Sequence, residues 1–130
     1  MSVFVDTSAL FALLDEDDAN HVAAVEALRR LRGGALVTHA YVVVETIALV
    51  SRRLGWSAVQ RLLDSILPIV SVVAVDDGLH DAALGAFRQA GSGQVSFVDR
   101  TSFAFMWAQR IDVALAFDAD FESAAFDLAT

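Results

Sequence analysis

The sequence predicts an α/β fold in which helices cover both faces of a parallel sheet. Short apolar runs alternate along the chain with longer segments of helical periodicity. These short runs are apolar throughout instead of alternating with polar residues, which is typical of strands buried on both faces. The chain has 130 residues, of which 56% are hydrophobic. That is enough for one substantial core, so we expect a single domain over residues 1–130.

Four apolar runs are expected to form the strands of this sheet. The first covers residues 2–6, where Val3, Phe4 and Val5 lead directly into Asp6. The others are residues 35–38, 69–75 and 112–118. Residues 119–130 are predicted to form a short helix or turn followed by a tail, so the sheet has four strands, or five if the tail adds a short edge strand.

The segments between the apolar runs are predicted to be helices. Residues 7–18 read as a short helix and an acidic turn, and residues 20–32 show apolar positions at helical spacing, closed by Gly33. Three valines at 42–44 favour a strand locally, but the length of the segment 39–54 and its ending favour a helix. Further helices are expected over 57–67, 76–90 and 96–111. Right-handed crossovers would start every helix that follows a strand at the carboxyl edge of the sheet.

The composition excludes several classes of function. There is no cysteine, which rules out disulfides, thiol nucleophiles and cysteine-ligated zinc and fits a cytoplasmic location. The longest uncharged apolar run, residues 66–75, is too short to span a membrane as a helix. No positive residue precedes the first apolar run, and Asp6 interrupts it, so we expect neither a secretory signal nor a membrane partner.

The charge pattern is uneven along the chain. A formal net charge of −8 argues against a general nucleic-acid binder. However, all nine cations are arginines and six of them lie between residues 29 and 61. Guanidinium groups suit phosphate recognition, although a solvated helix surface explains the same pattern. The candidate contacts with RNA or a protein partner are Arg29, Arg30, Arg52 and Arg53.

Three aspartates stand beside predicted helix starts. Asp6 and Asp118 each follow an apolar run, and Asp99 is the fourth residue of an S-x-x-D sequence that begins at Ser96. Each of them, taken alone, is explained by helix capping, since a carboxylate accepts hydrogen bonds from the free amides of a first turn. Capping therefore does not establish a functional site.

Glu45 has no such explanation. It lies inside the apolar segment 40–50, and the residues one turn away, Tyr41 and Ala48, supply no cation. A buried carboxylate without a partner is costly, so it would become protonated or would pair with a positive group such as a metal ion. Because Asp6 and Asp118 end parallel strands, they are expected to meet Asp99 and Glu45 at one edge of the sheet. Mg²⁺ or Mn²⁺ would relieve the repulsion among these acids and could activate water against a phosphate.

The ordered motifs of the chain resemble those of PIN-domain proteins. These motifs are FVDTSAL at 4–10, ET at 45–46 inside an apolar helix, SFVDRTSF at 96–103 and FDADF at 117–121. The likeness is closest to VapC-type toxins of bacterial toxin–antitoxin pairs, and the acidic turn before His21 is similar to that family as well. The resemblance covers nearly the whole chain.

The resemblance implies a three-layer α/β/α fold and a Mg²⁺- or Mn²⁺-dependent endoribonuclease. It further implies a homodimer held inactive by a VapB-type antitoxin. By motif position, the catalytic and metal-binding carboxylates would be Asp6, Glu45, Asp99 and Asp118. Asp120 would lie just outside the metal, Ser8 would orient a water or a phosphate, and Thr7 lies next to Ser8. Ala116 departs from the Thr or Ser that many relatives carry two residues before the last aspartate.

Two other classes of function compete with this interpretation. A phosphoryl-transfer domain with an aspartate nucleophile also places an Asp at a strand end, but it normally uses a lysine, and this chain has none. A catalytically weak or silent PIN domain acting as a binding module is favoured by Ala116 and opposed by the four acids. The three histidines, His21, His39 and His80, are expected to have core or surface positions, and Trp56 and Trp107 to be core or dimer contacts.

Overall fold

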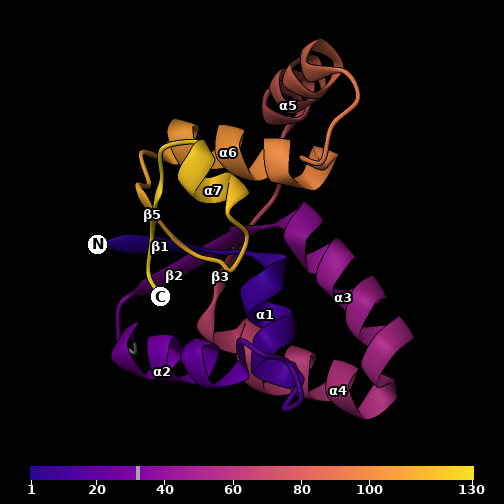
Figure 1. Ribbon diagram of the computed structural model, residues 1–130, viewed down its shortest axis with the longest axis vertical. Coiled ribbons are helices and arrows are strands. Elements are labelled where there is room, and N and C mark those ends of the chain that lie inside the picture. Colours follow the sequence, from indigo (N-terminus) through magenta and orange to yellow (C-terminus); the bar gives the residue numbers. More distant parts are fainter. Residues whose placement is uncertain (32) are drawn as a thin grey trace.

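The computed structural model describes residues 1–31 and 33–130 and has one central sheet (Figure 1). Its five strands are all parallel and follow the order β3-β2-β1-β4-β5. They are β1 (Ser2–Val5), β2 (Ala35–His39), β3 (Ser71–Val73), β4 (Val113–Leu115) and β5 (Asp127–Leu128). The predicted parallel α/β fold is confirmed, with the larger of the two expected strand numbers.

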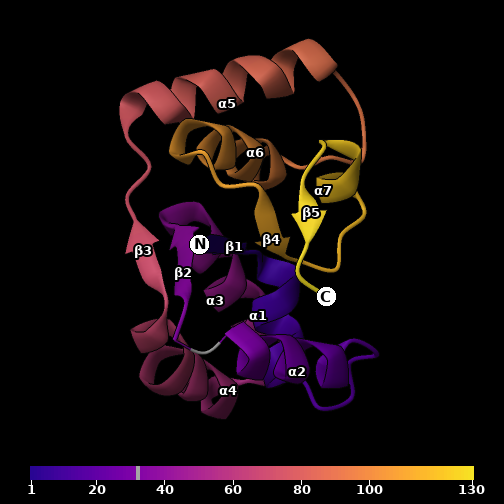
Figure 2. The same cartoon turned by 90° about the vertical axis from the view of Figure 1, so that its left-hand side faces the viewer.

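Helices cover both faces of this sheet. Figures 1 and 2 show α1 to α4 on one side and α5 to α7 on the other. The helices are α1 (Thr7–Leu14), α2 (His21–Leu31), α3 (Ala40–Leu54), α4 (Trp56–Arg61), α5 (Asp77–Ala90), α6 (Phe97–Gln109) and α7 (Asp120–Ser123). The three-layer arrangement leaves the carboxyl ends of the strands as the edge from which α1 and α3 begin.

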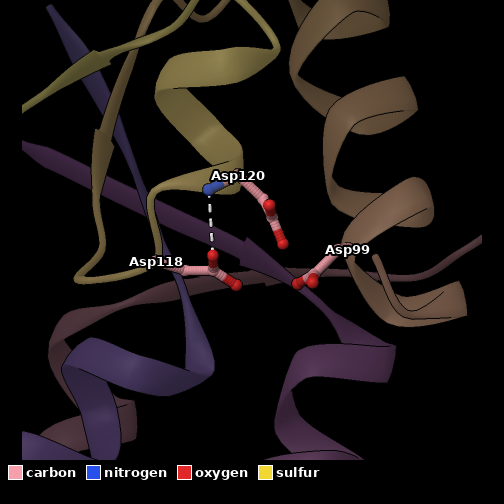
Figure 3. Close-up of side chains that lie close together, drawn as sticks. All are labelled: Asp99, Asp118 and Asp120. Atoms are coloured by element: carbon pink, nitrogen blue, oxygen red, sulfur yellow. Dashed lines mark hydrogen bonds between the residues drawn. The ribbon is translucent and has the colours of Figure 1, made fainter. Parts of the chain in front are cut away.

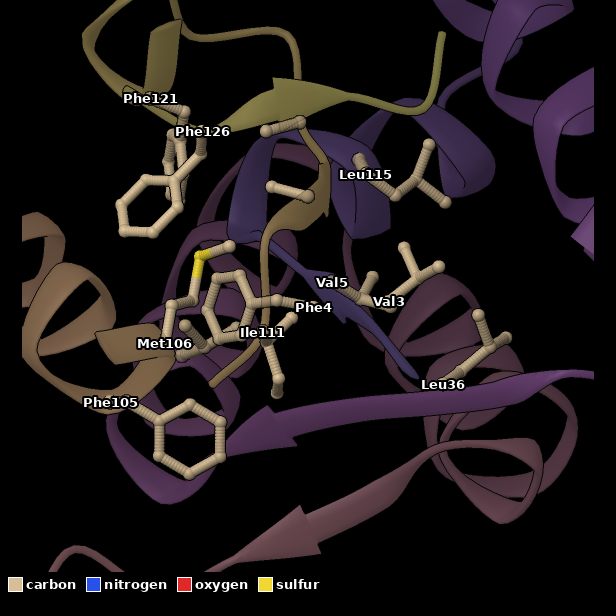
Figure 4. Close-up of a cluster of buried hydrophobic side chains, with 14 of the residues drawn as sticks. Val3, Phe4, Val5, Leu36, Phe105, Met106, Ile111, Leu115, Phe121 and Phe126 are labelled. Carbon is tan, nitrogen blue, oxygen red and sulfur yellow. The ribbon is translucent and has the colours of Figure 1, made fainter. Parts of the chain in front are cut away.

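The main core lies between the central strand β1 and the helices. Phe4 is completely buried, and its ring stacks on that of His39 at a centroid distance of 5.7 Å. It also stacks on the ring of Phe121, at a centroid distance of 5.9 Å (Figure 4). Phe4 also pairs in register with Val37 of β2, so its backbone is held in the sheet while its ring packs against Phe105 of α6 and Phe121 of α7. Burial of such an aromatic side chain is worth about 2–3 kcal/mol. The position of the residues that follow β1 is therefore fixed rigidly.

Several elements are shorter than the sequence predicts. The helix expected over 57–67 begins one residue earlier as α4 and continues as a π-helix (Leu62–Ile66) and a 3₁₀ turn (Leu67–Ile69), because Pro68 lacks an amide donor. The turn includes Ile69, the first residue of the strand expected over 69–75, and β3 covers only Ser71–Val73 because residues 70, 74 and 75 also lie outside it. The helix expected over 20–32 ends at Leu31, and residue 32 lies outside the described residues.

Three apolar side chains do not have the buried positions that their residue type suggests. Val22, within the predicted apolar stripe of α2, is 73% exposed, and the helix buries Ala24 and Ala27 instead. Trp56 and Trp107 are 66% and 61% exposed, so neither belongs to the core.

Among the described residues, no helix combines the length and the apolar character needed to cross a membrane.

Candidate functional site: an acidic cluster at the carboxyl edge of the sheet

Asp6 lies at the end of the central strand, where the chain turns from β1 into α1. Its backbone amide donates to the carbonyl of Leu115 at 3.0 Å, which extends the pairing of β1 with β4 by one residue. Its carboxylate accepts hydrogen bonds from the amide and the hydroxyl of Ser8, at 3.2 and 2.7 Å. Asp6 is thus the N-cap of α1, and it is only 3% exposed. Asp6 therefore caps α1 and at the same time places a carboxylate at the carboxyl edge of the sheet.

The hydroxyl of Ser8 joins two segments that are far apart in the sequence. It donates to Asp6 and accepts the amide of Phe117 at 3.0 Å. This bridge holds the end of β4 against the start of α1. Both sides of the hydroxyl are therefore engaged within the protein, which makes Ser8 a support for Asp6. Ala116, the neighbour of Phe117, is completely buried.

Thr7 and Glu45 lie where α1 and α3 approach each other. The Thr46 hydroxyl, next to Glu45, donates to the carbonyl of Val42 at 2.7 Å, and its oxygen lies 3.4 Å from the Thr7 hydroxyl. Thr7 therefore contributes to helix packing. The apolar sequence around Glu45 suggested an enclosed side chain, but Glu45 is partly exposed.

Asp99 and Asp118 lie on either side of β4 in the sequence, Asp99 in the first turn of α6 and Asp118 after the end of β4. The amide of Asp99 donates to Ser96 Oγ at 3.0 Å, so Ser96 is the N-cap of α6, as the S-x-x-D sequence predicts. Asp118 was expected to cap the last helix, but Ala119 occupies the N-cap position of α7. The Asp118 carboxylate nevertheless accepts the amide of Asp120 at 2.9 Å, which fixes its orientation.

Three carboxylates converge between α6 and α7. One oxygen each from Asp99, Asp118 and Asp120 lie within 4.8 Å of one another, and the side chains point toward a common space (Figure 3). Among the described residues, Asp6 and Glu45 are not members of this close group. Asp120, which the resemblance placed farther out, is thus a member of this close group together with Asp99 and Asp118.

The charges of Asp6 and Glu45 nevertheless act on the cluster. The pKa of Asp99 is raised from 3.8 to about 7, first by burial and then by the negative charges of Asp6, Asp118 and Glu45. Burial raises the pKa of Asp6 to about 6 against the opposing effect of the Ser8 hydrogen bonds, and Glu45 raises it further. The five acids therefore form one electrostatically coupled group.

The pKa of Asp120 is also raised. Loss of solvation is the largest cause, followed by the charge of Asp118, while the positive charge of Arg100 acts in the opposite direction. Arg100 was not singled out by the sequence reasoning. Its position directly after Asp99 was the available signal, because a cation next to an acid at the site changes the charge balance there.

The donor set of the cluster fits a hard divalent cation. Carboxylate oxygens are the ligands that Mg²⁺ and Mn²⁺ prefer, and three of them already lie close enough to share one ion. The pKa values of Asp99 and Asp120 are raised first by burial and then by the charges of neighbouring acids, and a cation would relieve this repulsion. Among the described residues, the one ion pair joins Arg29 to Glu26 at 2.7 Å, so no cationic side chain neutralises the cluster by direct pairing.

The other candidate residues lie away from this cluster. Arg29 pairs with Glu26, and the guanidinium of Arg30 donates to the carbonyl of Ala129. Arg52 and Arg53 are exposed in the last turn of α3. All four arginines are thus exposed, and Arg29 and Arg30 differ from Arg52 and Arg53 in that each has a partner within the protein.

The three histidines have structural positions. The Nδ1 atom of His21 is hydrogen-bonded to the carbonyl of Ala12 at 2.7 Å. The Nδ1 atom of His80 is hydrogen-bonded to the hydroxyl of Tyr41, also at 2.7 Å. His39 is completely buried, and burial lowers its pKa to about 4. The expectation of core or surface positions is confirmed.

The fold and the order of the acidic residues are those of a nuclease-like α/β domain with a metal-compatible acidic edge. The model of the PIN domain family matches residues 3–127, and the chain belongs to this family. VapC20 of Mycobacterium tuberculosis, described as a 23S rRNA-specific endonuclease, is 36% identical over 125 residues, which are 95% of this chain and 95% of that protein. The family indicated by the sequence motifs is thereby confirmed.

Solved structures agree with this assignment. The crystal structure of M. tuberculosis VapC20, described as a sarcin–ricin loop cleaving toxin, has a TM-score of 0.86 at 35% identity and covers 95% of each chain. FitAcB from Neisseria gonorrhoeae has a TM-score of 0.73 at 18% identity over 98% of this chain and 96% of that one. VapBC2 from Rickettsia felis, bound to promoter DNA, has a TM-score of 0.69 at 14% identity, with 98% and 97% covered. The last two likenesses concern the fold alone.

Proposed function

We propose that this protein is a metal-dependent endoribonuclease of the VapC type, acting as the toxin of a toxin–antitoxin pair. The observation that carries the proposal is the convergence of Asp99, Asp118 and Asp120 at the carboxyl edge of a PIN fold. The 36% identity to VapC20 over 95% of both chains supports the same class of activity. We treat residues 1–130 as one catalytic domain, since the family model spans nearly all of them.

In this proposal, Asp99, Asp118 and Asp120 hold one Mg²⁺ or Mn²⁺. Such an ion, when bound, would supply a water of lowered pKa and neutralise charge on the phosphate. Asp6 and Glu45 complete the negative environment, and their effect on the pKa of Asp99 supports this. Asp6, Glu45, Asp99 and Asp118 remain the catalytic acids of the proposal, with Asp120 added as a direct ligand.

The protein residues contribute orientation and proton exchange. The Ser8 hydroxyl is hydrogen-bonded both to the Asp6 carboxylate and to the amide of Phe117, the residue before Asp118. It therefore restrains Asp6 after β1 and Asp118 after β4. Asp99, with a pKa of about 7 in the metal-free protein, exchanges its proton near neutrality. The acids therefore release protons in the pH range where metal binding is needed.

The proposed substrate is RNA, and ribosomal RNA is the first to test because VapC20 is described as specific for 23S rRNA. We place the protein in the cytoplasm, where that substrate is found. Arg52 and Arg53 are the proposed basic contacts for RNA or antitoxin, since both are exposed at the end of α3. Arg29 and Arg30 are weaker candidates because each already has a partner in the protein. A VapB-type antitoxin and a second copy of the chain are the proposed protein partners.

Cleavage of purified ribosomes, followed by primer extension, tests the proposal. We expect cleavage with Mg²⁺ or Mn²⁺ and none in EDTA. Asp99→Asn is expected to lower the rate by roughly 100-fold or more, the size of loss that removal of an electrostatic group at an active site produces. Asp64→Asn, at an exposed acid in the π-helix segment, is the matched control and should retain wild-type activity.

Two further variants separate the acids of the cluster. Asp120→Asn should weaken Mn²⁺ binding, measured by calorimetry, as much as Asp118→Asn does. An Asp120 variant with unchanged Mn²⁺ affinity would return this residue to the outer position that the resemblance implied. Absence of cleavage by the wild-type protein with every metal and RNA tested, together with retained RNA or antitoxin binding, would favour the catalytically silent binding module.

A further inference from the structure

Arg100 lies beside the acidic cluster with unused hydrogen-bonding capacity. It follows Asp99 on the first turn of α6 and is partly buried. Its Nε atom is buried and has no hydrogen-bond partner. In the described part of the chain, its guanidinium forms no ion pair with any acid, although Asp120 is near enough for the positive charge to lower its pKa.

This arrangement is unusual for an arginine next to several carboxylates. A buried donor without an acceptor costs free energy, so most buried guanidinium nitrogens find a partner. Packing, rather than a protein acceptor, therefore holds the inner part of the Arg100 side chain. A guanidinium held by packing is already oriented, which lowers the entropy lost when it binds a ligand.

The ligand that matches these properties is an anion with more than one acceptor oxygen. The planar guanidinium offers several donors at a fixed spacing, and the nonbridging oxygens of a phosphodiester accept them in pairs. The acids around Arg100 would repel such an anion. The positive charge of the Arg100 guanidinium at the rim of the cluster opposes this repulsion and allows the anion to bind. A carboxylate of the protein would serve equally well, but the neighbouring acids are turned toward one another.

We propose that Arg100 binds a phosphate of the RNA substrate at the edge of the acidic cluster. The inference rests on the proposed function, because it takes RNA as the molecule that enters the site. It assigns the recognition of the backbone at the reacting position to α6, next to Asp99. Arg52 and Arg53, at the far end of α3, would then contact more distant parts of the RNA.

The test compares binding by the wild-type protein, Arg100→Lys, Arg100→Ala and the control Arg88→Ala, an exposed arginine near the end of α5. The probe is a labelled sarcin–ricin loop oligonucleotide, followed by fluorescence anisotropy in Ca²⁺, with the RNA checked for integrity by electrophoresis. Arg100→Ala should weaken binding on the order of 10- to 100-fold, Arg100→Lys should weaken it less, and Arg88→Ala should have no effect.

The salt dependence of binding distinguishes a phosphate contact from a structural effect. The logarithm of the binding constant falls linearly with the logarithm of the salt concentration. Loss of one phosphate contact should make this slope less negative by about 0.7 for a single-stranded site. A structural contribution of Arg100, through α7 and Asp120, would instead lower the melting temperature and the Mn²⁺ affinity without changing this slope. Wild-type affinity and slope in Arg100→Ala, or a loss of stability with an unchanged slope, would overturn the inference.

The outcomes also separate this inference from the proposed function. Cleavage that depends on Asp99 but not on Arg100, with unchanged RNA binding in Arg100→Ala, would overturn the inference and leave the nuclease intact. RNA binding that depends on Arg100 without any cleavage would support the inference and count against the nuclease. Failure of the wild-type protein to bind RNA at all would overturn both.

Discussion

Replacing Asp99 by asparagine should stabilise the metal-free protein while removing its stabilisation by metal. In the folded protein, burial and three neighbouring acids raise the pKa of Asp99 from 3.8 to about 7. The folded state therefore holds this proton more tightly than the unfolded state does. Stability must fall as the pH rises from about 4 to about 7, and the full cost is present above that range. An asparagine carries no charge and avoids this cost.

The size of the effect follows from the pKa difference. An increase from 3.8 to about 7 corresponds to about 4 kcal/mol at about 1.4 kcal/mol per pH unit. Asp99 is partly exposed, so solvent screening reduces this to roughly 1–2 kcal/mol. Loss of the favourable interaction between the Asp99 charge and the α6 dipole removes about 0.5 kcal/mol. The net gain is about 1 kcal/mol, which raises the melting temperature by roughly 3–6 °C.

Thermal unfolding in EDTA at about pH 8 and about pH 4 measures this prediction. Asp99→Asn should melt higher than wild type at the upper pH and differ little from it at the lower one, where Asp99 is protonated in the folded protein and only partly ionised in the unfolded chain. Mn²⁺ at about 100 times its Kd should add about 2.7 kcal/mol to the wild type and little to the variant, so the order reverses. A variant that melts below wild type in EDTA at pH 8, or that gains equally from Mn²⁺, would refute the reasoning. Asp64→Asn, at an exposed acid, should change neither result.

Three further predictions follow from the same contacts. Ser8→Ala leaves the Asp6 carboxylate without its 2.7 Å hydrogen bond, so we expect a loss of about 1–3 kcal/mol in chemical denaturation and slower cleavage; unchanged values in both assays would show that the bridge is dispensable. Mn²⁺ affinity by calorimetry should rise steeply between about pH 5 and pH 8, as Asp6 and Asp99, with pKa values of about 6 and 7, lose their protons, and a flat profile would contradict this. His39 should stay neutral with its proton on Nε2, donating to Ser102 at 2.9 Å, down to about pH 5 in ¹⁵N NMR spectra. Since burial lowers its pKa from 6.5 to about 4, it should reduce stability as the pH falls through that range, and an imidazolium signal at pH 6 would disprove the assignment.

Local sequence features predicted those parts of the site that depend on one segment alone. Val3 to Val5 form a continuously apolar run that can only be buried in the sheet, and Asp6 must then lie at its end. The S-x-x-D sequence likewise predicted that Ser96 caps α6 and that Asp99 lies in its first turn. In both cases the signal lies within one short segment of the sequence, although the partners that bury β1 come from β2 and β4.

Contacts between distant segments were decided by the tertiary structure. The nearness of Asp120 to Asp99 depends on how α7 packs against α6, through the rings of Phe103 and Phe121 at a centroid distance of 5.0 Å. The sequence shows that these two rings are apolar, but it does not show that they meet. For the same reason it could not predict that the Ser8 hydroxyl accepts an amide 109 residues away.

The charge state of the site also belongs to the tertiary structure. The sequence identifies Asp6, Glu45, Asp99 and Asp118 as acids, and the family order of motifs indicates that they belong together. Their pKa values, however, depend on burial and on mutual distance, which are properties of the packed molecule. The sequence by itself thus determined which acids are present and which elements carry them. Packing of α6 and α7 against the sheet decided which oxygens converge, how strongly they repel, and that the buried Nε atom of Arg100 has no hydrogen-bond partner among the described residues.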